Sequence, residues 1–404
     1  MNFAADVVLK PGVRLPPPAH GIAIADAELP THADVVIIGA GVVGLSIAWR
    51  AAIAGLKVTV VDHGEAGAGT TFSATGMLAA AAEHEPGSAV LMPFALDSQA
   101  LWPSFCAELE QESGVTIDFR RSGIVLAALS RDELERLRAR HVFLTSAGLD
   151  CSWVSGPDLR ALEPGLRPSA CAGIYCRNDH QVDPRALVAA LRLALARRGV
   201  ALIENCGQVK IDRNNNSIEG VRVSQEVCRT PRVVLATGAW TAMSGLLPEG
   251  VSVPVRPVKG QALALRARDQ RPALSHIVWT EQIHLAPKHD GRLIVGATME
   301  ETGFDASVTA GGVYALLEGA RRALPCVEEM EIEAIWTGFR PTSDDDAPIL
   351  GDVDGAGLVI ATGHHRNGIL LAPATADAIV ELIAHGEMPL NARGLSLKRF
   401  RTED

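Results

Sequence analysis

Residues 34–62 have the sequence DVVIIGAGVVGLSIAWRAAIAGLKVTVVD, and this stretch decides the fold. It begins with a β-branched run at 35–38, which is typical of a parallel strand buried on both faces. Gly39, Gly41 and Gly44 then fit the pattern G-x-G-x-x-G. The first glycine permits a tight turn, the second lets the backbone approach a pyrophosphate, and the third lets the helix pack on its strand. The free N–H groups at the start of that helix would bind the phosphates.

An acid closes this nucleotide-binding unit. Asp62 follows the expected second strand, 57–61, about 20 residues after the glycines, where a carboxylate accepts hydrogen bonds from ribose hydroxyls. We also expect the neighbouring residues Val43 and His63 to contact the nucleotide. A hydropathy window marks residues 35–55 as a candidate membrane span, but Arg50 and the internal glycines argue against it.

Composition bounds the class of protein. A chain of 404 residues with 48% hydrophobic and 21% charged residues suits an enzyme of two or three domains. Its net charge of -10 disfavours nucleic acid as a partner, and we expect no membrane partner either. Seven scattered cysteines without a C-x-x-C pair indicate a reducing compartment, so we expect a cytoplasmic protein.

The first 33 residues form a separate N-terminal extension. They contain Pro16-Pro17-Pro18 and lack the basic and then apolar pattern of a secretory signal. We expect a surface arm, which either packs on a partner subunit or forms a flexible tail. A homo-oligomer is expected.

Helices and strands alternate through the middle of the chain. The expected helices are 97–112, 131–147 and 184–198, the last opened by Asp183-Pro184. Buried strands are expected at 124–129 and 232–236. From Val253 to Val295 the pattern changes to short strands with turns, which indicates an antiparallel sheet, at 261–265, 277–280, 283–286 and 293–295. Two further strands are expected at 335–339 and 348–350.

A second glycine-containing turn lies near the end of the chain. Residues 358–383 have the sequence LVIATGHHRNGILLAPATADAIVELI, which predicts a strand that enters a helix through residues 364–367. His364 and His365 are adjacent and would point to different sides, so we expect no metal site there.

Four stretches carry a family resemblance: GAGVVGLS (39–46), GAGTTFSATGMLAA (67–80), WTGFRPTSDDDAPILG (336–351) and ATGHHRNGILLAPAT (361–375). Through them, nearly everything after residue 33 resembles the glycine oxidase branch of the D-amino-acid oxidase superfamily of flavoproteins. The last stretch is the most specific. The resemblance implies an α/β fold of the glutathione-reductase type, with a Rossmann-like FAD-binding domain and an inserted substrate domain that contains an antiparallel β-sheet.

This organisation implies a discontinuous FAD-binding domain. We assign residues 34–96, 170–250 and 335–404 to it, and residues 97–169 and 251–334 to the substrate domain. FAD would be held without a covalent bond, since the sequence has no cysteine or histidine that matches a known attachment motif.

The cofactor contacts expected beyond the first turn come from three regions. Small and hydroxylated residues after Asp62 suit the pyrophosphate and the flavin edge: Thr70, Thr71, Ala74, Gly76, Met77 and Leu78. By the resemblance, Val209 would bond the adenine through its backbone. The N–H groups of Asn367, Gly368 and Ile369, at the start of the final helix, would face the flavin N1–C2=O edge and raise its potential. The remaining expected contacts are Thr237, Gly238, Trp240, His365 and Arg366.

Three residues are expected to act on the substrate. Arg340 matches the family position that binds the substrate's carboxylate, for which a bidentate guanidinium is suited. Arg366 matches a second arginine beside the flavin; for both arginines a structural salt bridge is the alternative. His284 stands where glycine oxidases have a tyrosine, and Lys288 replaces an arginine. A histidine there would hydrogen-bond, or when protonated attract a second carboxylate, or serve only for packing.

These features predict FAD-dependent oxidation of a small amino acid or N-substituted glycine, with glycine, sarcosine and iminodiacetate as candidates. Hydride transfer to flavin N5 would give an imine and then a 2-oxo acid such as glyoxylate, with H2O2 formed from O2. Two alternatives remain: an amine or D-amino-acid dehydrogenase that passes electrons to a quinone, and an FAD-binding subunit of a larger complex.

Overall fold

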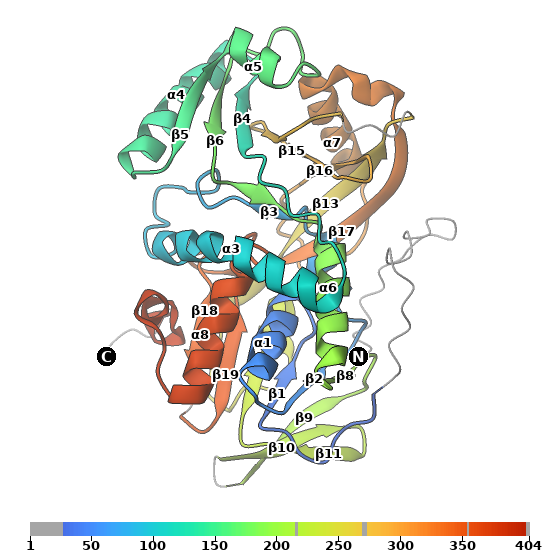
Figure 1. Cartoon of the computed structure of the whole chain (residues 1–404), viewed down its shortest axis with the longest axis vertical. Coiled ribbons are helices and arrows are strands. Elements are labelled where there is room, and N and C mark those ends of the chain that lie inside the picture. The colour runs from blue at the N-terminus through green and yellow to red at the C-terminus, as the bar shows by residue number, and fades with distance from the viewer. Residues whose placement is uncertain (1–26, 215–216, 269–272, 354, 401–404) are drawn as a thin grey trace.

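The computed structural model of this chain describes residues 27–214, 217–268, 273–353 and 355–400. They form two main sheets, one in each half of the molecule (Figure 1). Most of the expected N-terminal arm lies outside the described residues. At the end of that segment, His32 forms a parallel bridge with Arg229, and the Ala33 N–H donates to the Arg229 carbonyl (2.9 Å).

A six-stranded sheet forms around the glycine-rich stretch, in the order β18-β19-β12-β1-β2-β8. Its strands are parallel except β18, which is antiparallel to β19. The bounds are β1 Val35–Ile38, β2 Val58–Val61, β8 Ala201–Ile203, β12 Val233–Leu235, β18 Ile349–Asp352 and β19 Leu358–Thr362. Every residue of β1 and β2 is buried, which confirms the two expected strands.

Helices cover one face of this sheet and a small sheet covers the other (Figure 1). Val35 and Ile37 of β1 pack beneath the helices, whereas Val36 and Ile38 pack toward the small sheet, because successive strand residues face opposite sides. The helices are α1 Val42–Ile53, α3 Met92–Ser113, α6 Pro184–Arg197 and α8 Ala372–His385. The small sheet has the order β11-β10-β9, with β9 Val209–Asn214, β10 Ser217–Val223 and β11 Glu226–Arg229.

An eight-stranded sheet fills the other half, in the order β17-β13-β16-β15-β14-β4-β6-β5. Neighbours are antiparallel except β14 and β4, so the expected antiparallel sheet is confirmed. Its strands are β4 Ile124–Ala128, β5 Cys151–Ser155, β6 Ala172–Cys176, β13 Val255–Arg266, β14 Ile277–Trp279, β15 His284–Pro287, β16 Arg292–Gly296 and β17 Glu331–Ser343. β13 and β17 exceed their expected lengths because they pair from Val255–Ser343 to Arg266–Glu331.

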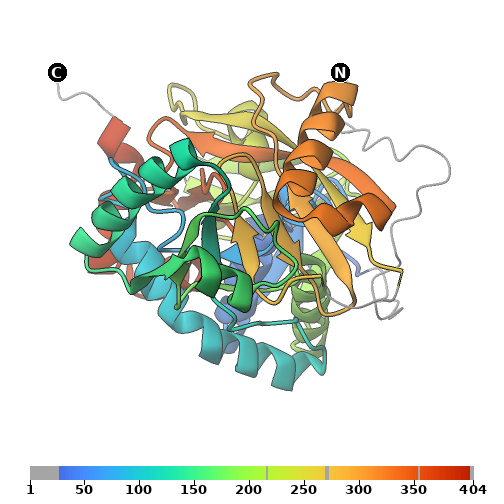
Figure 2. The same ribbon diagram turned by 90° about the horizontal axis from the view of Figure 1, so that it is seen from above.

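Three helices flank the eight-stranded sheet: α4 Arg131–Ser146, α5 Gly156–Leu162 and α7 Ala310–Ala323. Seen from above, α7 (orange) and α4 (green) lie at opposite sides of the molecule (Figure 2). The short elements are α2 Thr70–Ser73, β3 Met77–Leu78, β7 His180–Gln181, η1 Gly238–Met243, η2 Pro325–Glu329, η3 Leu390–Leu395 and η4 Leu397–Phe400. Across the four described ranges, no helix has the length and apolar character needed to cross a membrane.

The domain boundaries remain a proposal: strand β6 lies wholly in the other domain from the one expected, and β17 and α3 each cross an expected boundary. β6 and β17 belong to the eight-stranded sheet, although the expected division begins the FAD-binding pieces at residues 170 and 335. Helix α3 packs with α1, α6 and α8, through Phe94, Trp102 and Phe105 among others, although residues from 97 were expected in the substrate domain.

Candidate active site

A cavity of about 1810 Å³ is lined by residues from both main sheets. Its wall includes the carboxyl ends of β1 and β2, the segment 67–77, η1, and side chains of β13, β15 and β17. Common ligand sites occupy roughly 300–1,000 Å³, so this cavity has room for an extended cofactor together with a small substrate.

The glycine-rich turn fits a pyrophosphate. A Cβ on Gly39, whose φ is +113°, would lie 2.4 Å from the Ala236 carbonyl oxygen. On Gly44 it would lie 1.9 Å from the Gly39 oxygen, so this glycine is required for the helix to approach its strand. Gly41 lines the cavity, where the nearest atom to an added Cβ is the Thr71 Oγ1 at 3.4 Å. A side chain there would fill the space that phosphates need.

Asp62 is held at the edge of the cavity by two backbone groups. Its Oδ2 accepts from the Ala40 N–H (2.5 Å) and its Oδ1 from the Gly64 N–H (2.8 Å). Burial raises the pKa of Asp62, although these two hydrogen bonds oppose the shift. Each carboxylate oxygen accepts more than one hydrogen bond, so both remain suited to ribose hydroxyls. The fixed carboxylate and the glycine cradle together fit FAD.

The segment after Asp62 is tied to both halves of the molecule. Thr71 Oγ1 accepts from the Val42 N–H at the start of α1 (2.9 Å). Thr70 Oγ1 donates to the Phe339 carbonyl of β17 (2.6 Å). These hydroxyls, expected to contact the cofactor, therefore also hold the segment against the cavity wall.

Most expected cofactor contacts line the cavity, and three do not. The lining residues are Gly39, Gly41, Val43, Asp62, His63, Thr70, Thr71, Ala74, Gly76, Met77, Val209, Thr237, Gly238, Trp240, His365, Arg366, Gly368 and Ile369. Gly44 acts in packing, as above. Leu78 lies outside the lining because its side chain is fully buried in the core beneath the helices.

The expected role of Asn367 needs correction. Its N–H donates to the His364 carbonyl (2.8 Å) within the closing turn, so this donor is already engaged. Helix α8 begins only at Ala372, and residues 368–371 form a turn before it. The expected donors near the flavin are therefore Gly368 and Ile369, which lie in that turn.

Arg340 extends from β17 along the floor of the cavity. Its side chain is largely buried, and its Nη1 donates to the Lys259 carbonyl of β13 (3.3 Å). Gly260 makes room for it, since a Cβ there would lie 2.6 Å from Nη1. Burial lowers the pKa of Arg340, but a guanidinium stays protonated in proteins, so the cavity keeps a positive charge.

Arg366 lines the cavity and also forms ion pairs. A position beside the flavin and a structural salt bridge, the two roles expected for it, are therefore compatible. Its Nε lies 2.9 Å from Glu83 Oε2, and its Nη2 lies 2.8 Å from Glu85 Oε1. These carboxylates raise the pKa of Arg366 against the effect of burial. Glu83 is itself a buried cavity residue that the sequence analysis did not identify.

His284 faces the cavity from β15 as a neutral side chain. Burial, assisted by the charges of Arg340, Lys288 and Arg366, lowers its pKa to about 3. The expectation that a protonated His284 attracts a second carboxylate is therefore wrong at neutral pH. Within the described ranges its buried Nε2 has no hydrogen-bond partner, so hydrogen bonding to a ligand remains open to it.

The two histidines of the closing turn have structural partners on different sides. His364 Nε2 lies 3.1 Å from Thr375 Oγ1, and His365 Nδ1 lies 2.8 Å from Thr342 Oγ1. Burial lowers the pKa of each to about 3. In the part of the chain that the structure describes, no group of three metal-ligating side chains occurs.

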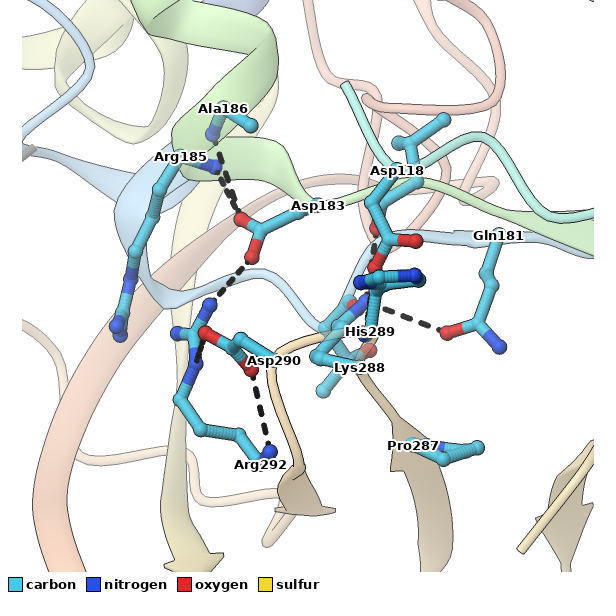
Figure 3. Close-up of polar contacts among 12 residues, drawn as sticks. Asp118, Gln181, Asp183, Arg185, Ala186, Pro287, Lys288, His289, Asp290 and Arg292 are labelled. Carbon is cyan, nitrogen blue, oxygen red and sulfur yellow. Dashed lines mark hydrogen bonds and ion pairs between the residues drawn. The ribbon is translucent and has the colours of Figure 1, made fainter. Parts of the chain in front are cut away.

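The buried Lys288 forms hydrogen bonds with the backbone of the cavity wall. Lys288 Nζ donates to the carbonyls of Thr75 (2.7 Å) and Val182 (2.8 Å), and it contacts Gln181 Oε1 at 3.4 Å. The neighbouring carboxylate of Asp183 caps α6 and pairs with Arg292 (2.6 Å), as Figure 3 shows. Burial lowers the pKa of Lys288 to about 8. The ammonium thus fixes the Thr75 carbonyl, and the Thr75 methyl and the His284 imidazole both lie against Gly296.

Comparisons with known proteins agree with this geometry. The family described as DAO, FAD dependent oxidoreductase, matches residues 34–382. The chain is 35% identical to "Glycine oxidase" of Geobacillus kaustophilus (strain HTA426), covering 91% of this chain and 97% of that protein. It is 31% identical to "Hydrogen cyanide synthase subunit HcnC" of Pseudomonas aeruginosa, covering 92% and 97%. A crystal structure of glycine oxidase from Geobacillus kaustophilus superposes with a TM-score of 0.85 at 33% identity, over 92% of this chain and all of that one.

Proposed function

This chain belongs to the family of FAD-dependent oxidoreductases, and on that premise we propose that it oxidises glycine or a small N-substituted glycine, such as sarcosine or iminodiacetate. It is an FAD-dependent enzyme that acts on amines or amino acids. The proposed products are an imine, which hydrolyses to a 2-oxo acid such as glyoxylate, and H2O2 from O2. The cofactor would be held by the glycine turn, Asp62 and the closing turn, without a covalent bond.

The buried charge of Arg340 is the observation that carries this proposal. Its guanidinium lies in a cavity between two sheets, near the neutral imidazole of His284. A carboxylate that enters would meet a preorganised fork of donors at low dielectric, where such pairs are strongest. When bound, FAD supplies the hydride acceptor; Arg340 would orient the substrate so that its α-carbon faces that acceptor.

His284 supports the choice of N-substituted glycines. An imidazole is shorter than a phenol, so it leaves room for a substituent on the nitrogen of the substrate. Its unpartnered Nε2 would form a hydrogen bond with a polar group of that substituent. Charge attraction is not part of this proposal, because the ring is neutral.

Peroxide release from the purified protein, measured across a panel of small amines, tests the proposal. Turnover of glycine, sarcosine or iminodiacetate with one H2O2 per amine would support it. Turnover that needs a quinone, without peroxide, would favour the dehydrogenase. A protein that oxidises amines only in a complex would act as a subunit, as the name of the Pseudomonas relative describes for that protein. A cytoplasmic location and a homo-oligomer are part of the proposal and need fractionation and light scattering.

A further inference from the structure

Glu83 is held in the cavity wall by an anchored loop. The residues before it, 79–82, are buried alanines between β3 and α3. The N–H groups of Ala81 and Ala82 donate to the carboxylate of Asp179 (3.0 and 2.7 Å), and the Glu83 N–H donates to the Ala79 carbonyl (3.0 Å). Its position is therefore fixed by the backbone rather than by its own side chain.

The carboxylate of Glu83 is close to two arginines but incompletely satisfied. Oε2 lies 2.9 Å from Arg366 Nε, and the charge of Arg340 also acts on it. That contact is an ion pair without hydrogen-bond geometry, and among the described residues Oε2 has no hydrogen-bond partner although it is buried. Such an atom is costly to bury unless a ligand completes its shell.

The chemistry of an amino acid requires such a group. At neutral pH the substrate carries an ammonium, and a hydride leaves the α-carbon only after the nitrogen has lost a proton. Arg340 would pair with the carboxylate of this zwitterion, but it cannot bind the ammonium group. Within the described cavity lining, Glu83 is the one buried carboxylate: Asp62 is partly exposed at the nucleotide end, and Glu65, Glu281 and Glu318 are exposed.

Resting on the proposed oxidation of an amino acid, we propose that Glu83 binds the substrate's ammonium group and accepts its proton. One N–H bond breaks, the proton forms an O–H bond on the Glu83 carboxylate, and the electron pair stays on nitrogen as the lone pair of a neutral amine. Glu83 is then a neutral acid, and Arg366 keeps its second partner, Glu85.

Electrostatics supports this direction of transfer. Burial raises the pKa of Glu83, against the lowering effect of Arg366 and Arg340, and a raised pKa makes a carboxylate a stronger base. The ion pair with Arg366 opposes this shift and favours the carboxylate form, which is the form that can accept a proton.

The test compares Glu83→Gln with Glu85→Gln, which removes the other carboxylate of Arg366. The observed quantity is the rate of flavin bleaching after anaerobic mixing with amine, from pH 6 to pH 10. For Glu83→Gln we expect a loss at pH 7 of about one factor of ten for each pH unit that separates pH 7 from the pKa of the free amine. This loss should shrink tenfold per pH unit and disappear near that pKa. Glu85→Gln should keep the parent's pH profile. Glu83→Asp should fall between parent and Glu83→Gln.

A second readout needs no turnover. Propionate has the shape of glycine but a methyl group in place of the ammonium, and its binding is followed by the change in flavin absorbance. Glu83→Gln should bind propionate at least as tightly as the parent does. A Glu83→Gln profile parallel to the parent's, or equal losses in both Gln variants, would overturn the proposal. A parent that no amine reduces would instead refute the proposed function.

Discussion

Replacing Arg340 with alanine should remove the carboxylate site, together with a charge that acts on Glu83 and His284. One of its N–H groups donates to the Lys259 carbonyl, and the fork as a whole faces the cavity. Two charge-assisted hydrogen bonds to a carboxylate contribute about 1.5–3 kcal/mol each, or about 3–6 kcal/mol together. At about 1.4 kcal/mol per factor of ten, kcat/KM should fall by roughly 10² to 10⁴. Water that enters the vacated space will hydrate the substrate's carboxylate and recover part of this energy. We therefore expect kcat/KM to fall by at least about tenfold.

The assay measures kcat/KM for peroxide release, with FAD content determined on the same sample. FAD content should stay near that of the parent, because Arg340 does not touch the glycine turn. Arg340→Lys, which keeps the charge but loses the fork, should fall between parent and alanine variant. Adding methylguanidinium should restore part of the activity of Arg340→Ala. A flavin-loaded Arg340→Ala enzyme with kcat/KM within threefold of the parent for every substrate would refute the reasoning.

Three further outcomes follow from the site. Acid precipitation should release FAD into a yellow supernatant, and a pellet that stays yellow would show a covalent bond. His284→Tyr should shift the preference from iminodiacetate toward glycine; because the pKa of His284 is about 3, the preference of the parent should not change through protonation of this ring between pH 6 and pH 8. Identical rankings in parent and variant would make His284 a packing residue. Burial lowers the pKa of Lys288 from its ordinary value of 10.5 to about 8. Burying the charged lysine therefore destabilises the folded protein below pH 8 by on the order of 3 kcal/mol, and this cost fades as pH rises toward 10.5. The Tm of Lys288→Met minus that of the parent should therefore decline between pH 8 and pH 10; a flat difference would contradict a buried charged lysine.

Local patterns were sufficient for the nucleotide-binding half. The run 35–38, the three glycines and Asp62 each act through neighbours close in sequence, so strand, turn, helix and acid were predictable in order. The antiparallel sheet was also predictable from its turns, although β13 and β17 are longer because each strand supports the other across a separation that no local pattern contains.

The roles of three site residues depend on contacts that the sequence analysis could not foresee. Glu83 follows a run of alanines and looks like a loop acid; only the fold brings it to Arg366, far along the chain. We expected that His284 could be protonated. Burial and the charges of Arg340, Lys288 and Arg366, which come from separate parts of the chain, lower its pKa to about 3 and keep the ring neutral near pH 7. The Asn367 N–H was assigned to the flavin, whereas the turn itself uses it. In each case burial or a competing partner, rather than residue type, sets the role.

Anaerobic mixing of the flavin-loaded protein with glycine, sarcosine and iminodiacetate tests the central claim most directly. The absorbance of oxidised flavin should disappear within the mixing experiment for at least one of these amines, and admission of O2 should restore it with one H2O2 per flavin. Flavin that stays oxidised in the presence of every small amine carrying a carboxylate would contradict the account.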